Sequence, residues 1–393
     1  HARFVIYPAR PNHFNPGRMG PKKDNCGRWK TAADHHGRPF GLSEHLGASF
    51  AWNAPNKGSD RFGPYAGVPD DGNEPAYADF YFRNSEDYQA DSEMQVWYTY
   101  NEPFRDYWQA VMKEVIDRYE PDLLYSDGML PFGKGWPETA ISDDRYPAYQ
   151  RGLETVAYLY NKSIEKHGEN RAVYNQKDRR EEIYSVGVLD IERSQLPDIR
   201  PQPWQTDTCI GGWFYDVRAK LKRPSHIIEM LVDIIAKNGT LLLNILQLPD
   251  GSLDDETRYI LRELSAWIPV CGEGVYGTRP WRVCGEGTSA VVMEGFTEEQ
   301  VPWQETDYRF TVKNNTLYAF LMKAPQNRVA VLRSLGEQDA VRSVRLLGEG
   351  PVPFAQAFGV LTVQLPEALT PTYTNCLALE PHQSRSQKPA PPR

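Results

Sequence analysis

The sequence predicts an α/β fold, a (β/α)8-like barrel of the TIM type, followed by an antiparallel β-sandwich. In the first part of the chain, short apolar segments alternate with longer amphipathic ones, as in repeated strand–helix–strand units. In the second part the long segments stop, and short runs alternate apolar and polar residues around turn signals. We therefore expect a catalytic barrel over 1–278, a sandwich over 279–380 and a disordered, polar, proline-rich tail over 381–393.

The apolar segments of the barrel have the length of buried parallel strands. An eight-stranded barrel needs two more than the six that the pattern reveals. Either two strands are not recognised by their apolar pattern, or the N-terminal part of the barrel is incomplete in this chain. The six predicted strands are Phe4–Tyr7, Phe40–Glu44, Leu123–Ser126, Ala172–Tyr174, Val186–Ile191 and Leu241–Ile245.

Between these strands, apolar residues recur at helical spacing. A first helix is expected to end at His35-His36, before Gly37, which makes these two histidines a surface pair rather than metal ligands. Residues 46–99 show no period, and a loop of this length is usually functional. The longer predicted helices are Tyr100–Tyr119, Tyr146–Lys166, Ile227–Lys237 and Asp254–Trp267.

Composition excludes several classes of function. The 393 residues carry a net charge of −8 without a basic block, which argues against nucleic acid as a partner. No apolar run is long enough to cross a membrane, and the first residues do not resemble a signal peptide. The five cysteines form no CxxC pair, so we expect buried or free thiols, no metal and no redox centre.

Asp127 is the first candidate catalytic residue. The segment 121–128, PDLLYSDG, reads as an apolar strand that ends in a carboxylate and a glycine. In a barrel this position is the C-terminal mouth, where catalytic side chains lie. An aspartate there can also simply cap the next helix.

Glu192 is the second candidate. The segment 187–193, GVLDIER, again ends a predicted strand in a carboxylate, here beside Arg193. A surface ion pair is the alternative interpretation. Two carboxylates at different strand ends of one barrel provide the pair that a glycosidase needs, about 5–5.5 Å apart in a retaining enzyme.

Aromatic and hydrogen-bonding residues are concentrated in 203–215, PWQTDTCIGGWFY, which we expect to be a loop. Such a mixture suits a sugar, because rings pack on its apolar face while amides and hydroxyls bind its hydroxyl groups. Trp204, Gln205 and Trp213 are the candidate sugar contacts here, and loop packing is the alternative. His45, at a predicted strand end, is a further candidate, with a packed histidine as the alternative.

Several segments, in this order over nearly the whole chain, carry a resemblance to a known family. They are MGPKKD at 19–24, RPFGLS at 38–43, YSDG at 125–128, PWQTD at 203–207, LVDIIAKNG at 231–239, LLLNI at 241–245, PDG at 249–251 and GEGVYGTRPW at 272–281. Together they resemble glycoside hydrolase family 29, the α-L-fucosidases. The resemblance implies an exo-acting, retaining hydrolase that needs no cofactor, with Asp127 as nucleophile and Tyr125 as its aromatic neighbour in the sugar pocket.

The acid/base residue departs from the family pattern. Many members carry Pro-Trp-Glu where this chain has Gln205, and an amide cannot titrate. By the resemblance, Glu192 is the substitute acid/base and Arg193 matches a sugar-contacting arginine. Asp207 is a lesser candidate for the acid/base role.

The N-terminal segment departs as well. The family has a His-His-Asp segment ahead of the GPKKD motif, and both histidines touch fucose hydroxyls. Here only His13, in Asn12-His13-Phe14, stands near that place. A non-catalytic or impaired fucose-binding relative is therefore the alternative to an active hydrolase, and a glycosidase of another sugar is a third hypothesis.

The resemblance also implies a partner and a compartment. The expected partner is a fucosylated oligosaccharide or glycan, with no nucleic acid and no membrane, and oligomerisation stays open. The family's use on external glycans predicts a periplasmic or secreted protein, although no signal peptide is visible in this chain.

Overall fold

The structure is a computed structural model. It describes residues 4–12, 14–82, 98–99, 101–132, 150–179, 183, 185–291, 298, 300–369 and 373–381. By its internal contacts the chain forms two compact units, His1–Asp190 and Ile191–Arg393, and each is described by itself. The predicted boundary at 278/279 is a different division and stays a prediction.

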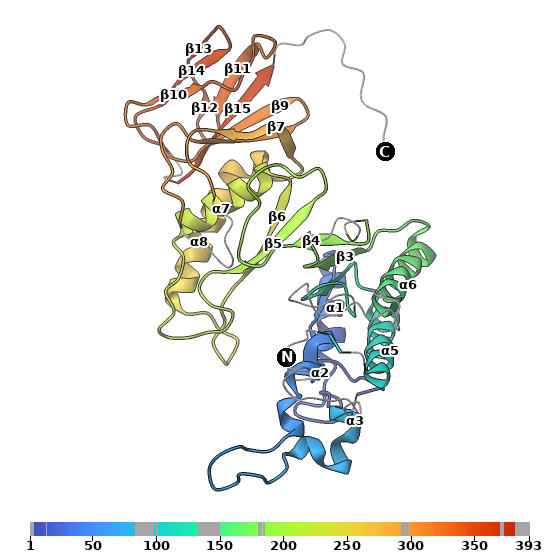
Figure 1. Ribbon diagram of the computed structural model, residues 1–393. Coiled ribbons are helices and arrows are strands. Elements are labelled where there is room, and N and C mark those ends of the chain that lie inside the picture. The colour runs from blue at the N-terminus through green and yellow to red at the C-terminus, as the bar shows by residue number, and fades with distance from the viewer. Residues whose placement is uncertain are drawn as a thin grey trace. The chain divides into compact units, whose positions relative to one another are not determined.

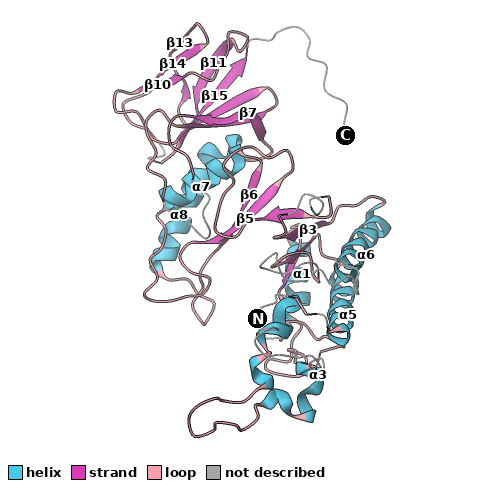
Figure 2. Ribbon diagram, viewed as in Figure 1, coloured by secondary structure: helices cyan, strands magenta, loops and turns pink. Residues whose placement is uncertain are grey.

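The first unit contains four parallel strands, hydrogen-bonded in the order β1 (Gly41–Glu44), β2 (Leu123–Ser126), β3 (Val173–Gln176) and β4 (Val188–Asp190). Helices α1 (Asn25–His35), α5 (Glu102–Tyr119) and α6 (Gln150–His167) accompany them (Figures 1 and 2). Strand and helix therefore alternate as predicted. The segment predicted as an unstructured loop holds short helical turns: Leu46–Ala48, Ser49–Trp52, Pro55–Lys57, Asp71–Asn73, Pro75–Tyr77 and Ala78–Tyr81.

Helix α5 illustrates why the sequence forms these elements. Asn101 caps its first turn by accepting a hydrogen bond from the Phe104 N–H, and the helix ends where Glu120 adopts a left-handed conformation. Its apolar face, which includes Trp108 and Ile116, is fully buried in the two hydrophobic clusters of this unit. Burial of this face positions the strands that carry the candidate site.

The second unit begins with two parallel strands, β5 (Trp204–Cys209) and β6 (Gly239–Asn244), and two helices, α7 (Pro224–Ala236) and α8 (Asp255–Cys271). The expectation of a loop at 203–215 was wrong for its first half, because β5 is a strand in which every residue is buried. The polar residues of β5 interrupt the apolar pattern by which a buried strand is recognised in a sequence. The hydroxyl oxygen of Thr206, for example, lies 2.7 Å from the carbonyl oxygens of both Ile191 and Ser194, so its single proton is satisfied inside the fold.

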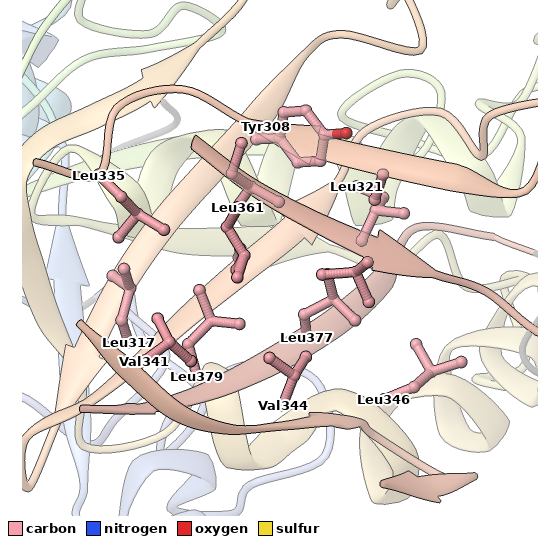
Figure 3. Packing of buried hydrophobic residues seen from close by; sticks show 14 of the residues in the cluster. Tyr308, Leu317, Leu321, Leu335, Val341, Val344, Leu346, Leu361, Leu377 and Leu379 are labelled. Carbon is pink, nitrogen blue, oxygen red and sulfur yellow. The ribbon is translucent and has the colours of Figure 1, made fainter. Parts of the chain in front are cut away.

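The predicted sandwich follows as two antiparallel sheets, with strand orders β10-β14-β13 and β12-β11-β15-β9-β8-β7. Alternate side chains of both sheets form one apolar core, and Figure 3 shows Leu317, Leu361 and Leu377 among them. The strands are β7 (Arg279–Glu286), β8 (Tyr308–Lys313), β9 (Thr316–Leu321), β10 (Val329–Leu332), β11 (Val341–Leu346), β12 (Gly350–Pro351), β13 (Phe354–Ala357), β14 (Val360–Gln364) and β15 (Asn375–Pro381).

A second core of this unit joins α7 and α8 to the sandwich. Trp267 of α8 and Val232 of α7 pack in the same buried cluster as Phe320 of β9. A buried ion triad reinforces this contact, because Asp233 of α7 binds Lys237 Nζ at 2.5 Å and Arg309 Nε of β8 at 2.6 Å. The helices and the sandwich therefore share one hydrophobic core.

Most of the predicted elements are confirmed, with shifts of a few residues at their ends. Phe4–Tyr7 is an exception, since it forms no strand in the structure. All five cysteines are free thiols, as expected. No helix among the described residues is long and apolar enough to cross a membrane. Residues 382–393, which include most of the predicted tail, lie outside the described residues.

Candidate active site

Asp127 directly follows β2, at the carboxyl end of the parallel strands of the first unit. Its backbone N–H donates to the Glu44 carbonyl at the end of β1 over 2.9 Å, which extends the pairing of the two strands by one residue. The sequence predicted this strand-end position for Asp127. The backbone of Asp127 is thus fixed at the strand end by this hydrogen bond to β1.

Three side chains surround the Asp127 carboxylate. Lys177 Nζ lies 2.6 Å from Oδ1 and His45 Nδ1 lies 3.3 Å from Oδ2. The Tyr125 hydroxyl oxygen is 3.3 Å from Oδ1, but it is only 2.8 Å from Oδ2 of Asp190. Since a phenol has one proton to donate, the shorter contact to Asp190 is the favoured hydrogen bond.

His45 is held as a neutral side chain. Burial lowers the pKa of His45 to about 4, and this effect outweighs the opposing attraction of the Asp127 carboxylate. Its ring packs edge-on against Trp52, with ring centroids 4.5 Å apart. At neutral pH the imidazole can therefore donate one hydrogen bond to Asp127 without adding a full positive charge.

Glu44 lies behind this group. Its Oε2 accepts hydrogen bonds from the Trp108 indole and from the Gly47 N–H, each over 3.2 Å. Burial raises the pKa of Glu44, and these hydrogen bonds only partly oppose the rise. The residue is therefore a buried carboxyl that supports the end of β1.

A cavity of about 1080 Å³ opens beside these residues. Its walls come from the N-terminal segment, α1, β1, β2 and α5, and they include Glu44, His45, Tyr125 and Asp127. This volume is large enough for a sugar. Much of the remaining lining is apolar, including Trp29, Phe40 and Leu42.

The second unit carries Glu192, Arg193, Trp204, Gln205 and Trp213. Glu192 and Arg193 form a turn immediately after the end of β4, and the Arg193 N–H donates to the Asp207 carbonyl over 2.9 Å. Glu192 is half-buried. The Arg193 guanidinium donates from Nε to Oε2 of Glu298 over 2.9 Å. Glu192 also interacts electrostatically with Arg193, so the alternative interpretation as an ion pair stays open.

Strand β5 changes the role of one predicted sugar contact. Trp204 has no exposed surface, and its indole N–H donates to the Lys237 carbonyl over 2.9 Å. The prediction that Trp204 binds substrate is therefore corrected, because a fully enclosed ring has no face to offer to a sugar. Gln205 is buried in the same strand, with 8% of its surface exposed.

Trp213 lies in the loop after β5 and is partly exposed, next to the highly exposed Phe214. Asn244, the last residue of β6, donates to the Trp213 carbonyl over 3.2 Å and so anchors the loop to the strand end. This placement keeps Trp213 as a candidate contact. His13 lies outside the described residues, so its predicted role stays a prediction.

The structure therefore brings Tyr125, Asp127 and His45 together in the first unit, and it groups Glu192, Arg193 and Gln205 around β5 in the second. In the ranges that the structure describes, no three His, Cys, Asp or Glu side chains are placed to hold a metal ion. His35 and His36 are an exposed pair with ring centroids 4.9 Å apart.

Sequence analysis did not identify two residues of the candidate site, Lys177 and Glu298. Lys177 follows the carboxyl end of β3, so the rule that drew attention to Asp127 applies to it as well. Glu298 carries no such signal, because it lies 105 residues from Arg193 in a segment without a motif. Only the tertiary structure brings Glu298 and Arg193 together.

Comparisons with known proteins agree with this architecture. The family model for alpha-L-fucosidase matches residues 1–273, and the model for the alpha-L-fucosidase C-terminal domain matches 287–379. Tissue alpha-L-fucosidase of Mus musculus is 27% identical over 268 residues, which are 66% of this chain and 52% of the relative. The Homo sapiens tissue enzyme is 25% identical over 228 residues, covering 56% of this chain and 42% of the relative. The chain thus spans about half the length of these curated relatives.

Solved structures show the same fold. One alpha-L-fucosidase superposes with a TM-score of 0.65 at 21% identity, covering 97% of this chain and 72% of the other. The Thermotoga maritima alpha-fucosidase in complex with fucose has a TM-score of 0.63 at 21% identity, covering 96% and 73%. These neighbours confirm the predicted barrel followed by a C-terminal sandwich. With the family model matching more than half of its residues, the chain belongs to the alpha-L-fucosidase family, glycoside hydrolase family 29.

Proposed function

We propose that this chain is an exo-acting, retaining α-L-fucosidase that releases terminal α-L-fucose from fucosylated glycans. The observation that carries the proposal is Asp127, a carboxylate on a strand end that faces a cavity of about 1080 Å³. Membership in the family and the likeness to a Thermotoga maritima alpha-fucosidase solved with fucose support the choice of sugar.

In the first step Asp127 acts as the nucleophile. One carboxylate oxygen attacks the anomeric carbon while the bond from that carbon to the glycosidic oxygen breaks, which leaves a covalent fucosyl-enzyme. Lys177 and His45 hold the two oxygens of the carboxylate in place. Oδ2 is the better nucleophile, because the neutral His45 lies 3.3 Å from it, whereas the Lys177 ammonium lies 2.6 Å from Oδ1.

Glu192 is the proposed acid/base. In the first step it gives its proton to the departing glycosidic oxygen, and in the second it takes a proton from water, whose oxygen attacks the anomeric carbon and releases Asp127. Two inversions return the original α configuration. Gln205 supports this assignment only indirectly, since its amide has no proton to exchange at neutral pH.

The proposed substrate fixes the expected partner and compartment. We propose a terminal fucose on an oligosaccharide or glycan, bound in part by Arg193 and Trp213. Fucosylated glycans of this kind are external to the cytoplasm, which favours a periplasmic or secreted protein.

Hydrolysis of an aryl α-L-fucoside by this chain and by its Asp127→Ala, Glu192→Ala and Gln205→Ala variants tests the proposal. We expect Asp127→Ala to lose at least about 10⁴-fold in kcat, because the nucleophile is gone. Azide should restore turnover in both carboxylate variants with different products. It should give β-fucosyl azide with Asp127→Ala and α-fucosyl azide with Glu192→Ala, while Gln205→Ala keeps most of its activity.

The alternative role has its own outcome. If the wild-type chain fails to hydrolyse the aryl fucoside but L-fucose raises its melting temperature, a fucose-binding relative replaces the hydrolase. An inverted azide product from Glu192→Ala would contradict the assignment of the two carboxylates.

A further inference from the structure

Arg193 shows one edge of its guanidinium to solvent. Its Nε is bound to Glu298, whereas its two terminal nitrogens make no hydrogen bond to the described protein residues. The side chain is about one-third exposed, at 32%. Its backbone has a φ of 47°, a left-handed conformation that is uncommon for a residue other than glycine. Arg193 therefore has an uncommon backbone conformation, and N–H groups of its guanidinium are available to donate to a ligand.

Glu298 provides the support. Its side chain is only 4% exposed, and its carboxylate accepts from Arg193 Nε at 2.9 Å, from Lys222 Nζ at 3.0 Å and from the Thr208 hydroxyl. Lys222 is itself fixed by a 2.6 Å bond to the Cys209 carbonyl. A buried carboxylate with two cations and a hydroxyl is fully satisfied, so the whole cluster is rigid.

Arg193 and Lys222 both bind the Glu298 carboxylate, and Arg193 also interacts electrostatically with Glu192. Lys222 is nearly buried, with 10% of its side chain exposed, whereas Arg193 is exposed at the edge of its guanidinium that does not bind Glu298. Two parallel N–H donors on a charged, planar group suit neighbouring hydroxyl oxygens of a sugar.

We propose that Glu298 is a positioning residue that orients Arg193 toward the sugar. This inference rests on the proposed function and extends it, because Glu298 belongs to the part of the chain matched by the C-terminal domain model, 287–379. The C-terminal region thereby contributes to a contact made by the barrel. The Glu298 carboxylate is already engaged by three side chains, so we assign it a supporting role rather than a contact with the sugar.

The test uses Glu298→Gln, with L-fucose affinity measured by calorimetry and aryl-fucoside kinetics measured in parallel. We expect KM and the dissociation constant of L-fucose to rise together by about 10- to 100-fold, with a smaller change in kcat, since the lost orientation weakens binding of the sugar. Glu298→Asp, which keeps the charge, should recover part of the affinity.

A double-mutant cycle separates positioning from a purely structural role. In the Arg193→Ala background, Glu298→Gln should change L-fucose affinity by less than about twofold, because its effect passes through Arg193. The matched control is Glu273→Gln, which breaks another glutamate–arginine pair of this unit, at 2.8 Å from Arg345, and should leave affinity unchanged. If Glu298→Gln folds poorly, Thr208→Val, which removes one donor to Glu298, replaces it in the same cycle.

The outcomes are distinct for the inference and for the proposed function. Equal L-fucose affinity of wild type and Glu298→Gln, or additive effects of Glu298→Gln and Arg193→Ala, would overturn the positioning role. Absence of hydrolysis by a wild type that binds L-fucose overturns the proposed function alone. A wild type that neither binds nor hydrolyses overturns both.

Discussion

At the scale of the residue, the environment of each side chain decides its chemistry. Asp127 lies beside an ammonium at 2.6 Å, whereas the nearby Glu44 is enclosed among Trp108 and β1 and has a raised pKa. The two carboxyl groups therefore lie in different surroundings, since Asp127 contacts a cation whereas burial raises the pKa of Glu44.

Histidine burial predicts a pH dependence of stability. Burial, followed by the charge of Lys222, lowers the pKa of His226 from its ordinary 6.5 to about 4, and burial does the same for His45. Between these values the unfolded chain binds protons that the folded chain does not, so the free energy of unfolding falls as pH drops from 6.5 to 4. Above pH 6.5 these histidines add no slope.

We expect His226→Gln to reduce the fall in unfolding free energy between pH 7 and pH 4.5 by up to about 2 kcal/mol. Urea denaturation at the two pH values measures it. His167→Gln, at an exposed position, is the control and should leave the fall unchanged. A His226→Gln variant with the wild-type slope would show that His226 is protonated equally in both states.

At the scale of the element, a buried carboxylate on α7 adds to the apolar contacts between this helix and the sandwich. Asp233 is completely buried, and it accepts from Lys237, one turn on in the chain, and from Arg309 on β8. Arg309 also lies over the Trp303 ring at 4.6 Å. Removal of Asp233 leaves two buried cations without their anion.

We expect Asp233→Asn to lower the free energy of unfolding by about 3–5 kcal/mol, because uncompensated buried charges are costly. Equilibrium unfolding in urea measures the change. Asp216→Asn provides the comparison, since the Asp216–Arg218 pair is exposed and its loss should have little effect. A comparably small effect of Asp233→Asn would mean that water or relaxation compensates the two cations.

At the scale of the whole molecule, the last strands and helices of the barrel sequence belong to the same compact unit as the sandwich. Residues 191–393 form one compact unit that holds β5, β6, α7, α8 and the sandwich. Trp267 and Val232 from the helices share a core with Phe320 from the sandwich. A cut between the two regions recognised by the family models would divide this core.

We therefore expect a chain that ends at Thr278 to expose the apolar face of α7 and α8 and to fail to fold as a monomer. Size-exclusion chromatography and binding of a hydrophobic dye measure this outcome. A chain that ends at Pro381 is the control, because the removed tail is polar and rich in proline. A monomeric, cooperatively unfolding 1–278 fragment would show that the barrel region folds without the sandwich.

The sequence was most informative where local chemistry and position coincide. Asp127 and β2 were both predicted because a short apolar run ends in a carboxylate and a glycine. Strand β5 was not, because Thr206, Asp207 and Thr208 break the apolar pattern, although the fold satisfies them in its interior. Trp204 was misassigned for the same reason, since an aromatic next to polar residues has the composition of a sugar site even when it is buried.

The sequence by itself therefore determined most of the strands and helices in their order, the change from barrel to sandwich, the family, and Asp127 at a strand end. Periodicity and short motifs encode these features locally, and they need no contact between distant residues. The tertiary structure alone decided that Lys177 and His45 hold Asp127, that Trp204 is core, and that Glu298 supports Arg193. Those contacts join residues up to 105 positions apart, and only packing of the folded chain brings their side chains within hydrogen-bonding distance.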